Sequence, residues 1–193
     1  MNLNRITPAA LFMIALFTTP AAAAAIGFPE RIAVENHQLE RVGFGTARYA
    51  GVVQVYDAAL YALPREAADI LGGATPKRLE IVYHRSIEAG MMIQAAQRTL
   101  ERQHGADTLR RWQPQIERLH AAYRDVAAGD RFALATAPGR GLWLEFNGRE
   151  SVRIADDEFA KLYFGIWLGE EPLSASLREA LLPAGCCASV AVD

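Results

Sequence analysis

Residues 42–61 read VGFGTARYAGVVQVYDAALY, a pattern of two strands joined by a short turn. Side chains of a strand point alternately to its two faces, so the even positions up to Arg48 share one face, and Gly43 and Gly45 lie on the other. A glycine inside a strand permits a bulge or the close approach of another backbone. Residues 52–61 are apolar on both faces, which predicts a strand that is covered on both sides.

Further elements follow from the hydrophobic periodicity downstream. Residues 77–84 predict another strand. An apolar stripe at helical spacing predicts a helix from Ser86, its expected cap, to about His104. A second helical stretch is expected over 107–126, and Pro114 should kink or divide it.

The rest of the chain repeats this order of strands and then helices. In residues 131–154, apolar residues occur at every second position along three short segments, and an Asn-Gly turn joins the last two. This pattern predicts an antiparallel meander. A helix is expected from Asp156 or Asp157 to Gly169, followed by a short helix over 174–182. Helices that are segregated from a mostly antiparallel sheet define an α+β domain.

The first 25 residues have the pattern of a secretory signal peptide. Arg5 precedes an apolar stretch over 9–17, and an alanine run follows at 21–25. The apolar stretch is too short for a permanent membrane span. A buried core helix at the start of the chain is the alternative. We expect residues 1–25 to be removed and residues 26–193 to form one domain in the periplasm or outside the cell.

The composition argues against several classes of function. The chain carries 20 basic and 22 acidic residues, a net charge of −2, so a nucleic-acid partner is not expected. Cys186 and Cys187 form either a vicinal disulfide or two thiols on a terminal tail. The sequence has no nucleophile elbow, no metal-binding spacing of His or Cys and no complete dinucleotide fingerprint. We therefore predict no catalytic residue, no metal and no cofactor.

Arg48 is the residue that this pattern does not explain. On an unbroken strand it shares a face with Val42 and Phe44, and a charge on an apolar face needs a partner. An internal carboxylate is one possible partner, and an irregular strand end that exposes Arg48 is another explanation. The third possibility is an anionic ligand, which the planar guanidinium holds well.

Three stretches of the chain resemble the chalcone isomerase superfamily, and within it the exported bacterial chalcone isomerase-like branch. They are residues 42–61, the strands after Gly129-Asp130-Arg131, and the ending FGIWLG at 164–169. The resemblance covers nearly all of residues 26–193. It implies an open-faced sandwich, which is an antiparallel sheet with helices packed on one face.

The same resemblance implies two kinds of function. Plant members close a chalcone ring with an arginine that holds an oxyanion, and other members bind fatty acids through an arginine and a tyrosine. Arg48 matches the family arginine, while Tyr56 stands where the enzymes carry a threonine, and residues 149–151 lack the second threonine. We expect a non-catalytic binder of a small apolar anion, such as a fatty acid, with Arg48 and Tyr56 as its ligand-binding residues. The alternative is an intramolecular lyase or isomerase that uses Arg48 to stabilise an oxyanion.

Overall fold

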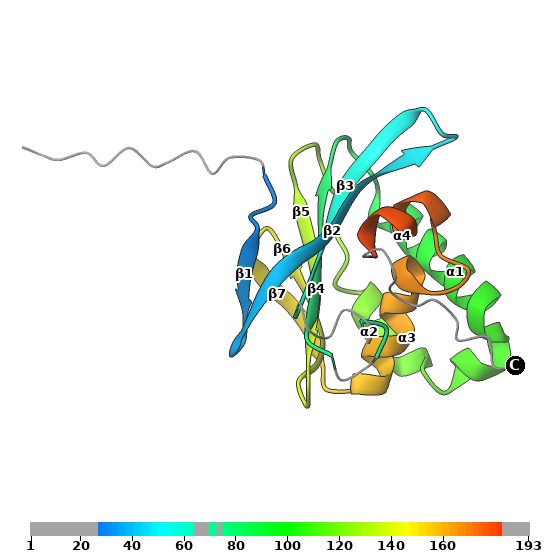
Figure 1. Cartoon of the computed structure of the whole chain (residues 1–193). Helices are drawn as coiled ribbons and strands as arrows, with labels where there is room; N and C mark the ends of the chain where they lie inside the picture. Colours follow the sequence, from blue (N-terminus) through cyan, green and yellow to red (C-terminus); the bar gives the residue numbers. More distant parts are fainter. Residues whose placement is uncertain (1–26, 64–69, 73–74, 183–193) are drawn as a thin grey trace, which may run out of the picture.

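The computed structural model describes residues 27–63, 70–72 and 75–182. The predicted signal peptide and the pair Cys186 and Cys187 lie outside the described residues. Seven strands form one antiparallel sheet in which every strand pairs with its neighbours in the sequence (Figure 1). The strands are β1 (Arg31–Val34), β2 (His37–Tyr49), β3 (Val53–Ala62), β4 (Lys77–Tyr83), β5 (Arg131–Ala137), β6 (Gly141–Phe146) and β7 (Arg149–Ile154).

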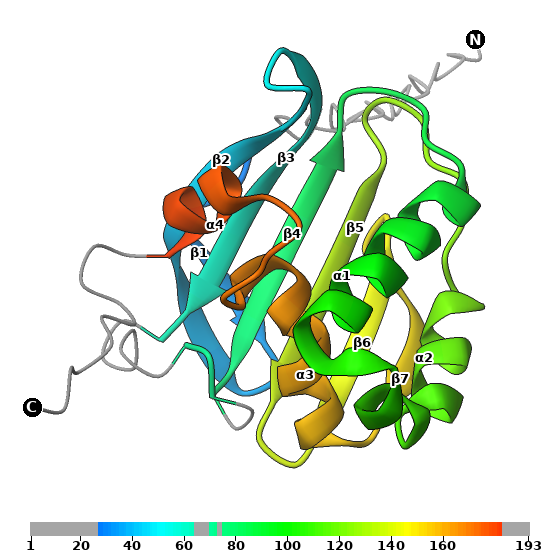
Figure 2. The same ribbon diagram turned by 90° about the vertical axis from the view of Figure 1, so that its right-hand side faces the viewer.

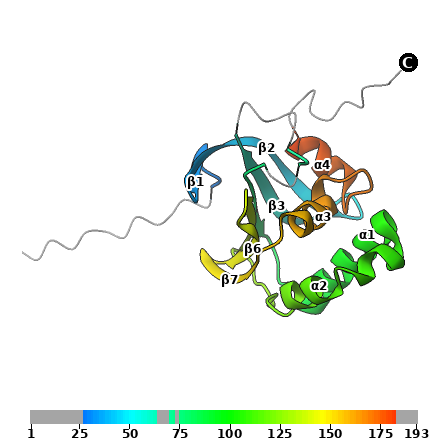
Figure 3. The ribbon, with the colours of Figure 1, turned by 90° about the horizontal axis from the view of Figure 1, so that it is seen from below.

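Four helices lie on one side of this sheet (Figure 3). This arrangement confirms the predicted α+β class and the open-faced sandwich. In the described part of the chain, no helix is both long enough and apolar enough to cross a membrane. The helices are α1 (Ala89–Arg110), α2 (Gln113–His120), α3 (Asp157–Leu168) and α4 (Ala175–Leu181).

The helix ends differ from the sequence prediction in two places. The first helix begins at Ala89 and not at Ser86, because the carboxylate of Asp125 accepts a 2.8 Å hydrogen bond from the Ala89 amide. Residues 121–126 are not helical, and Val126 instead forms a β-bridge with Ile87. At both helix ends, contacts between distant segments therefore decide where the helix stops, and the helical periodicity of the local sequence does not.

Other local signals are confirmed. Pro114 stands in the first turn of α2 and so divides the two helices, as its missing amide requires. Gly105 interrupts α1 with φ 72°, close to the expected end of the first helix. The side chain of Asp156 caps α3 by accepting a 2.9 Å hydrogen bond from the amide of Phe159.

The main hydrophobic core fills the space between the sheet and the helices. On β3 and β4 it contains Ala58, Leu60, Leu79 and Ile81, and a large aromatic share comes from α3. A smaller cluster lies on the opposite face and includes Ala59, Tyr61, Ala135 and Trp143. β3 is thus covered on both faces, as its sequence predicts.

The sheet curls around this second cluster, away from the helices. The β1–β2 turn reaches the opposite edge, where Arg153 of β7 donates a 3.1 Å hydrogen bond to the carboxylate of Glu35. β1 was not predicted from the sequence. It is only four residues long, which gives too little alternation for a period of two to be detected.

Gly43 and Gly45 allow α4 to lie directly on β2. A Cβ atom at Gly43 would stand 2.0 Å from the carbonyl oxygen of Leu181, and one at Gly45 would stand 2.7 Å from the Cβ of Ala180. Both distances are far below van der Waals contact, so only glycine fits. The prediction of a close backbone approach on this face of the strand is confirmed.

Candidate functional site

A cavity of about 330 Å³ opens between the sheet and the helices. Its walls come from strands β2 to β6 and from helices α1 and α3, which Figure 2 shows on the same side of the sheet. Its volume is at the low end of the range for small-molecule sites. Most of the lining is apolar and includes Ile81, Met92, Phe132, Leu134, Leu144 and Ile166.

Arg48 contributes to the lining of this cavity from the end of β2. The pairing of β2 with β3 shifts here, since Ala47 lies opposite Tyr56 while Arg48 lies opposite Gln54, and Val55 is left without a partner. A second shift leaves Val42 without a partner, and Val42 packs against the core on the helix side, whereas Phe44 lines the hollow on the other face. The expectation that the even-numbered residues up to Arg48 share one face is therefore wrong, because a bulge redirects the side chains beyond it.

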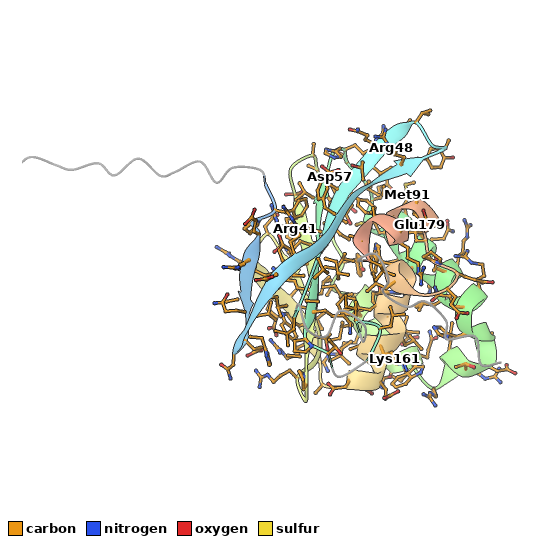
Figure 4. The ribbon with its side chains drawn as sticks, viewed as in Figure 1. Arg41, Arg48, Asp57, Met91, Lys161 and Glu179 are labelled. Atoms are coloured by element: carbon orange, nitrogen blue, oxygen red, sulfur yellow. The ribbon has the colours of Figure 1, made fainter. Side chains whose placement is uncertain are left out.

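The guanidinium of Arg48 is exposed and is not used by the fold. Among the described residues, Arg48 makes neither a hydrogen bond nor an ion pair. The internal ion pair, one of the three explanations considered for Arg48, is therefore not formed within this part of the chain. The irregular strand end does occur, and it places Arg48 at the hairpin end of the molecule (Figure 4). An exposed arginine beside an apolar cavity is available to an anion.

Tyr56 is buried in the same cavity, one strand away from Arg48. Its hydroxyl accepts a 3.2 Å hydrogen bond from the indole Nε1 of Trp167 on α3. Burial raises the pKa of Tyr56 to about 12, so the phenol stays protonated. Because the indole uses a lone pair of the oxygen, the hydroxyl proton remains free to donate to a ligand.

Three further tyrosines, Tyr49, Tyr83 and Tyr123, line the cavity, and no sequence pattern pointed to them. The hydroxyl of Tyr83 donates to the sulfur of Met92 at 3.2 Å, and its ring lies edge-on to Tyr56 with centroids 5.7 Å apart. The hydroxyl of Tyr123 lies 3.1 Å from that of Tyr163. Burial raises the pKa of Tyr123 to about 12. No local motif marks these residues, because three separate segments bring them together.

The chemistry offered by this cavity is hydrogen-bond donation and positive charge. Among the described residues that line it, none is Asp, Glu, His, Lys or Cys. A general acid or base with a pKa near neutrality is thus missing from the lining. The described part of the chain also contains no group of three or more potential metal ligands. The arrangement suits an apolar molecule with one anionic group.

Two other hollows are larger but more polar. One, of about 560 Å³, lies against α1 and α3 and includes Arg102, Arg111, Glu158 and Lys161. The other, of about 590 Å³, includes the charged residues Arg41 and Asp57 and the face of the sheet away from the helices. Figure 4 shows Lys161 far from Arg48, at the other end of the molecule. In the first hollow, acidic and basic groups are mixed, so the hollow favours neither an anionic nor a cationic ligand.

Comparisons with known proteins agree with this architecture. Among curated proteins, no sequence matches the chain. Among solved structures, a fatty-acid binding protein of Arabidopsis thaliana superposes with a TM-score of 0.61 at 14% sequence identity, covering 80% of this chain and 90% of that one. At this identity the likeness shows the fold. The model of the family described as chalcone isomerase-like matches residues 20–183, which is most of the sequence. The chain therefore belongs to the chalcone isomerase-like family.

Proposed function

We propose that this protein binds a small apolar anion, such as a fatty acid, and does not catalyse a reaction on it. The observation that carries this proposal is the apolar cavity of about 330 Å³ with an arginine that is free of partners among the described residues. An apolar chain would gain from burial, at about 0.8 kcal/mol for each CH₂ group. The carboxylate would gain a charge-assisted hydrogen bond from Arg48.

The polar groups are arranged in support of a carboxylate at one end of the cavity. Arg48 and Tyr56 come from adjacent strands, and the phenol of Tyr56 is held protonated by burial. Most of the remaining lining is apolar and includes Met92, Leu134 and Ile166. A ligand with its charge beside Arg48 and its chain towards these residues leaves no buried charge without a partner.

A binding role is favoured over an isomerase role by the absence of proton-transfer groups. Among the described residues of the lining, the only titratable groups are one arginine and tyrosines, and the pKa values of Tyr56 and of the partly buried Tyr123 are raised to about 12. Such groups hold a charge in place but do not exchange protons at neutral pH. The fatty-acid binding protein of similar fold supports the same choice of ligand class.

Identification of the bound molecule tests this function most directly. The protein is purified without detergent, and released lipids and small molecules are identified by mass spectrometry. A bound fatty acid or related amphipathic anion is the expected result, and titration of the delipidated protein with palmitate should then give saturable binding. A cavity that is empty after purification and does not saturate with palmitate would contradict the proposal.

We also propose that the protein works in the periplasm or outside the cell, because residues 1–25 have the pattern of a signal peptide. N-terminal sequencing of the exported protein should place its first residue between Ala24 and Gly27. A protein that keeps Met1 and stays in the cytoplasm would contradict this expectation.

A further inference from the structure

The exposed apolar side chains of this protein are concentrated around the cavity. Within the described part of the chain, six large apolar side chains are exposed. Phe44 is one of them, and it lies against the hollow on the face of the sheet away from the helices. The other five form what we call the apolar rim: Tyr49, Val52, Val53, Met91 and Leu173.

The apolar rim is continuous with the cavity. Tyr49 from β2, Met91 from α1 and Leu173 from the segment before α4 all line the cavity while remaining exposed to solvent. Tyr49 and Met91 are 74% and 63% exposed. Apolar surface that surrounds a cavity mouth is a sign of an interaction site.

The β2–β3 hairpin carries the most exposed part of the rim away from the body of the protein. Figures 1 and 2 both show this hairpin extending beyond the other strands. Its turn is tight, since the amide of Val52 donates a 3.2 Å hydrogen bond to the carbonyl of Tyr49, and Ala50 and Gly51 both have positive φ. Val52, at 75% exposure, therefore stands at a projecting tip.

The shape and chemistry of the rim fit a lipid bilayer better than a protein groove. The rim comes from three separate segments and projects outward at the hairpin, so it can enter a soft surface. A tyrosine, aliphatic side chains and the neighbouring Arg48 are the residue types that lie at membrane interfaces, where apolar groups enter the lipid and polar ends stay at the headgroups. The net charge of −2 means that apolar contact, and not general electrostatic attraction, must drive the association.

We infer that the apolar rim docks on the surface of a lipid bilayer, so that the ligand moves between the bilayer and the cavity without crossing water. This inference rests on the proposed function, because an apolar anion partitions into membranes and would be collected there. Docking by the rim would bring the cavity mouth against the lipid. The hairpin tip would enter the headgroup region, and Arg48 would lie where a carboxylate at the interface is found.

Vesicle binding tests the docking step by itself. The mature protein is sedimented with vesicles of phosphatidylcholine, with and without phosphatidylglycerol, at low and high salt. We expect binding to both vesicle types with a weak salt dependence. Val52→Asp should lower the partition coefficient roughly tenfold, since it places a charge where an apolar side chain would enter the lipid, while Val52→Leu should preserve binding. Val52 does not line the cavity, so the affinity for palmitate in solution should be the same in all three proteins.

The matched control removes an exposed aromatic side chain from the other face of the sheet. Phe44→Ser should leave vesicle binding unchanged, with thermal melting used to confirm that the variant is folded. Equal binding of Val52→Asp and the unchanged protein would overturn the inference. So would a dimer in light scattering that Val52→Asp dissociates, together with no vesicle binding, because the rim would then pair two copies of the chain.

Transfer kinetics separate this inference from the proposed function. A fluorescent fatty acid is loaded on the protein, and its transfer to acceptor vesicles is followed over time. Docking predicts a transfer rate that increases with vesicle concentration and that falls roughly tenfold in Val52→Asp. A rate independent of vesicle concentration would contradict docking even if palmitate binds. A protein that docks on vesicles but binds no palmitate would instead contradict the proposed function.

Discussion

The indole of Trp167 and the hydroxyl of Tyr56 are joined by a 3.2 Å hydrogen bond that connects α3 to β3 inside the cavity. Both side chains are almost completely buried. The bond fixes the position of the phenol oxygen and leaves its proton available, so a single contact both supports the fold and prepares a donor for a ligand. The two roles can be separated by substitution.

Tyr56→Phe removes this hydroxyl and keeps the ring. The indole N–H of Trp167 then loses its partner in a buried site, so the free energy of unfolding should fall by about 1 kcal/mol. Palmitate affinity should fall by about 0.5–1.5 kcal/mol, the range for a neutral hydrogen bond. Denaturant unfolding and calorimetric titration measure the two effects. Loss of stability with unchanged affinity would show that the hydroxyl serves the fold alone.

Arg48→Ala should weaken palmitate binding by about 1.5–3 kcal/mol, or roughly ten- to hundredfold, because a charge-assisted contact is lost. Stability should change by less than about 0.5 kcal/mol, since Arg48 is exposed and has no partner among the described residues. Arg48→Lys should recover only part of the affinity, because lysine keeps the charge and loses the planar fork. These values are measured by titration and thermal melting.

The control for Arg48 is Arg118→Ala. Arg118 is an exposed arginine of α2 that does not line the cavity, so this change alters the net charge equally and should leave the affinity unchanged. Equal effects of the two substitutions would mean that Arg48 acts only through the overall charge. A large fall in melting temperature for Arg48→Ala would assign the residue to the scaffold.

His120 should make the fold sensitive to acid. Burial lowers its pKa from 6.5 to about 4, and within the described residues its Nε2 atom has no hydrogen-bond partner. Between these two values the unfolded chain takes up a proton that the folded chain does not, so the free energy of unfolding falls as the pH decreases. The loss of unfolding free energy caused by His120 should be absent above about pH 6.5 and should reach roughly 3 kcal/mol near pH 4.

Urea unfolding at a series of pH values measures this slope. His120→Phe keeps the edge-on contacts with Tyr123 and Tyr163 and should flatten the slope below pH 6.5. His37→Gln, a change on β2, should leave the slope in place. If His120→Phe unfolds with the same pH dependence as the unchanged protein, another group is responsible.

Gly43→Ala should displace α4 from the sheet. The added Cβ would lie 2.0 Å from the carbonyl oxygen of Leu181. Because the backbone of β2 and the backbone of α4 meet here, the clash can be relieved only by moving the helix. We expect a loss of about 3 kcal/mol in the free energy of unfolding. Because Leu173 and Ser174 before α4 line the cavity, palmitate affinity should fall as well. Gly90→Ala is the matched control, since nothing lies within 4 Å of its Cβ position.

Local sequence was sufficient for most of the fold. Alternation along residues 42–61 identified the first long hairpin and placed Gly43 and Gly45 where either a bulge or a close backbone approach is possible, because both inferences depend only on which way neighbouring side chains point. Pro114 and Asp156 marked helix ends through their own backbone and side-chain chemistry. These signals act within a few residues, so they can be read without knowing the rest of the structure.

The site depended on contacts that local sequence does not contain. Arg48 was singled out by strand alternation and Tyr56 by the family resemblance, and both line one cavity in the structure. The bulge at Val55, beside Arg48, comes from the pairing of two strands. Tyr83 and Tyr123 join Tyr56 only after β4 and the segment behind α2 pack together, so their spacing in the chain carried no signal.

The sequence by itself therefore determined the antiparallel sheet, its helices and the glycines that let α4 lie on β2. Only the tertiary structure decided where the cavity opens, which hydroxyl groups enter it and that Arg48 faces solvent at its mouth. The physical reason is the range of the forces. Strand alternation and helix capping are set by covalent geometry over a few residues, whereas a cavity is the space left when side chains from distant segments pack, and no single segment encodes its shape.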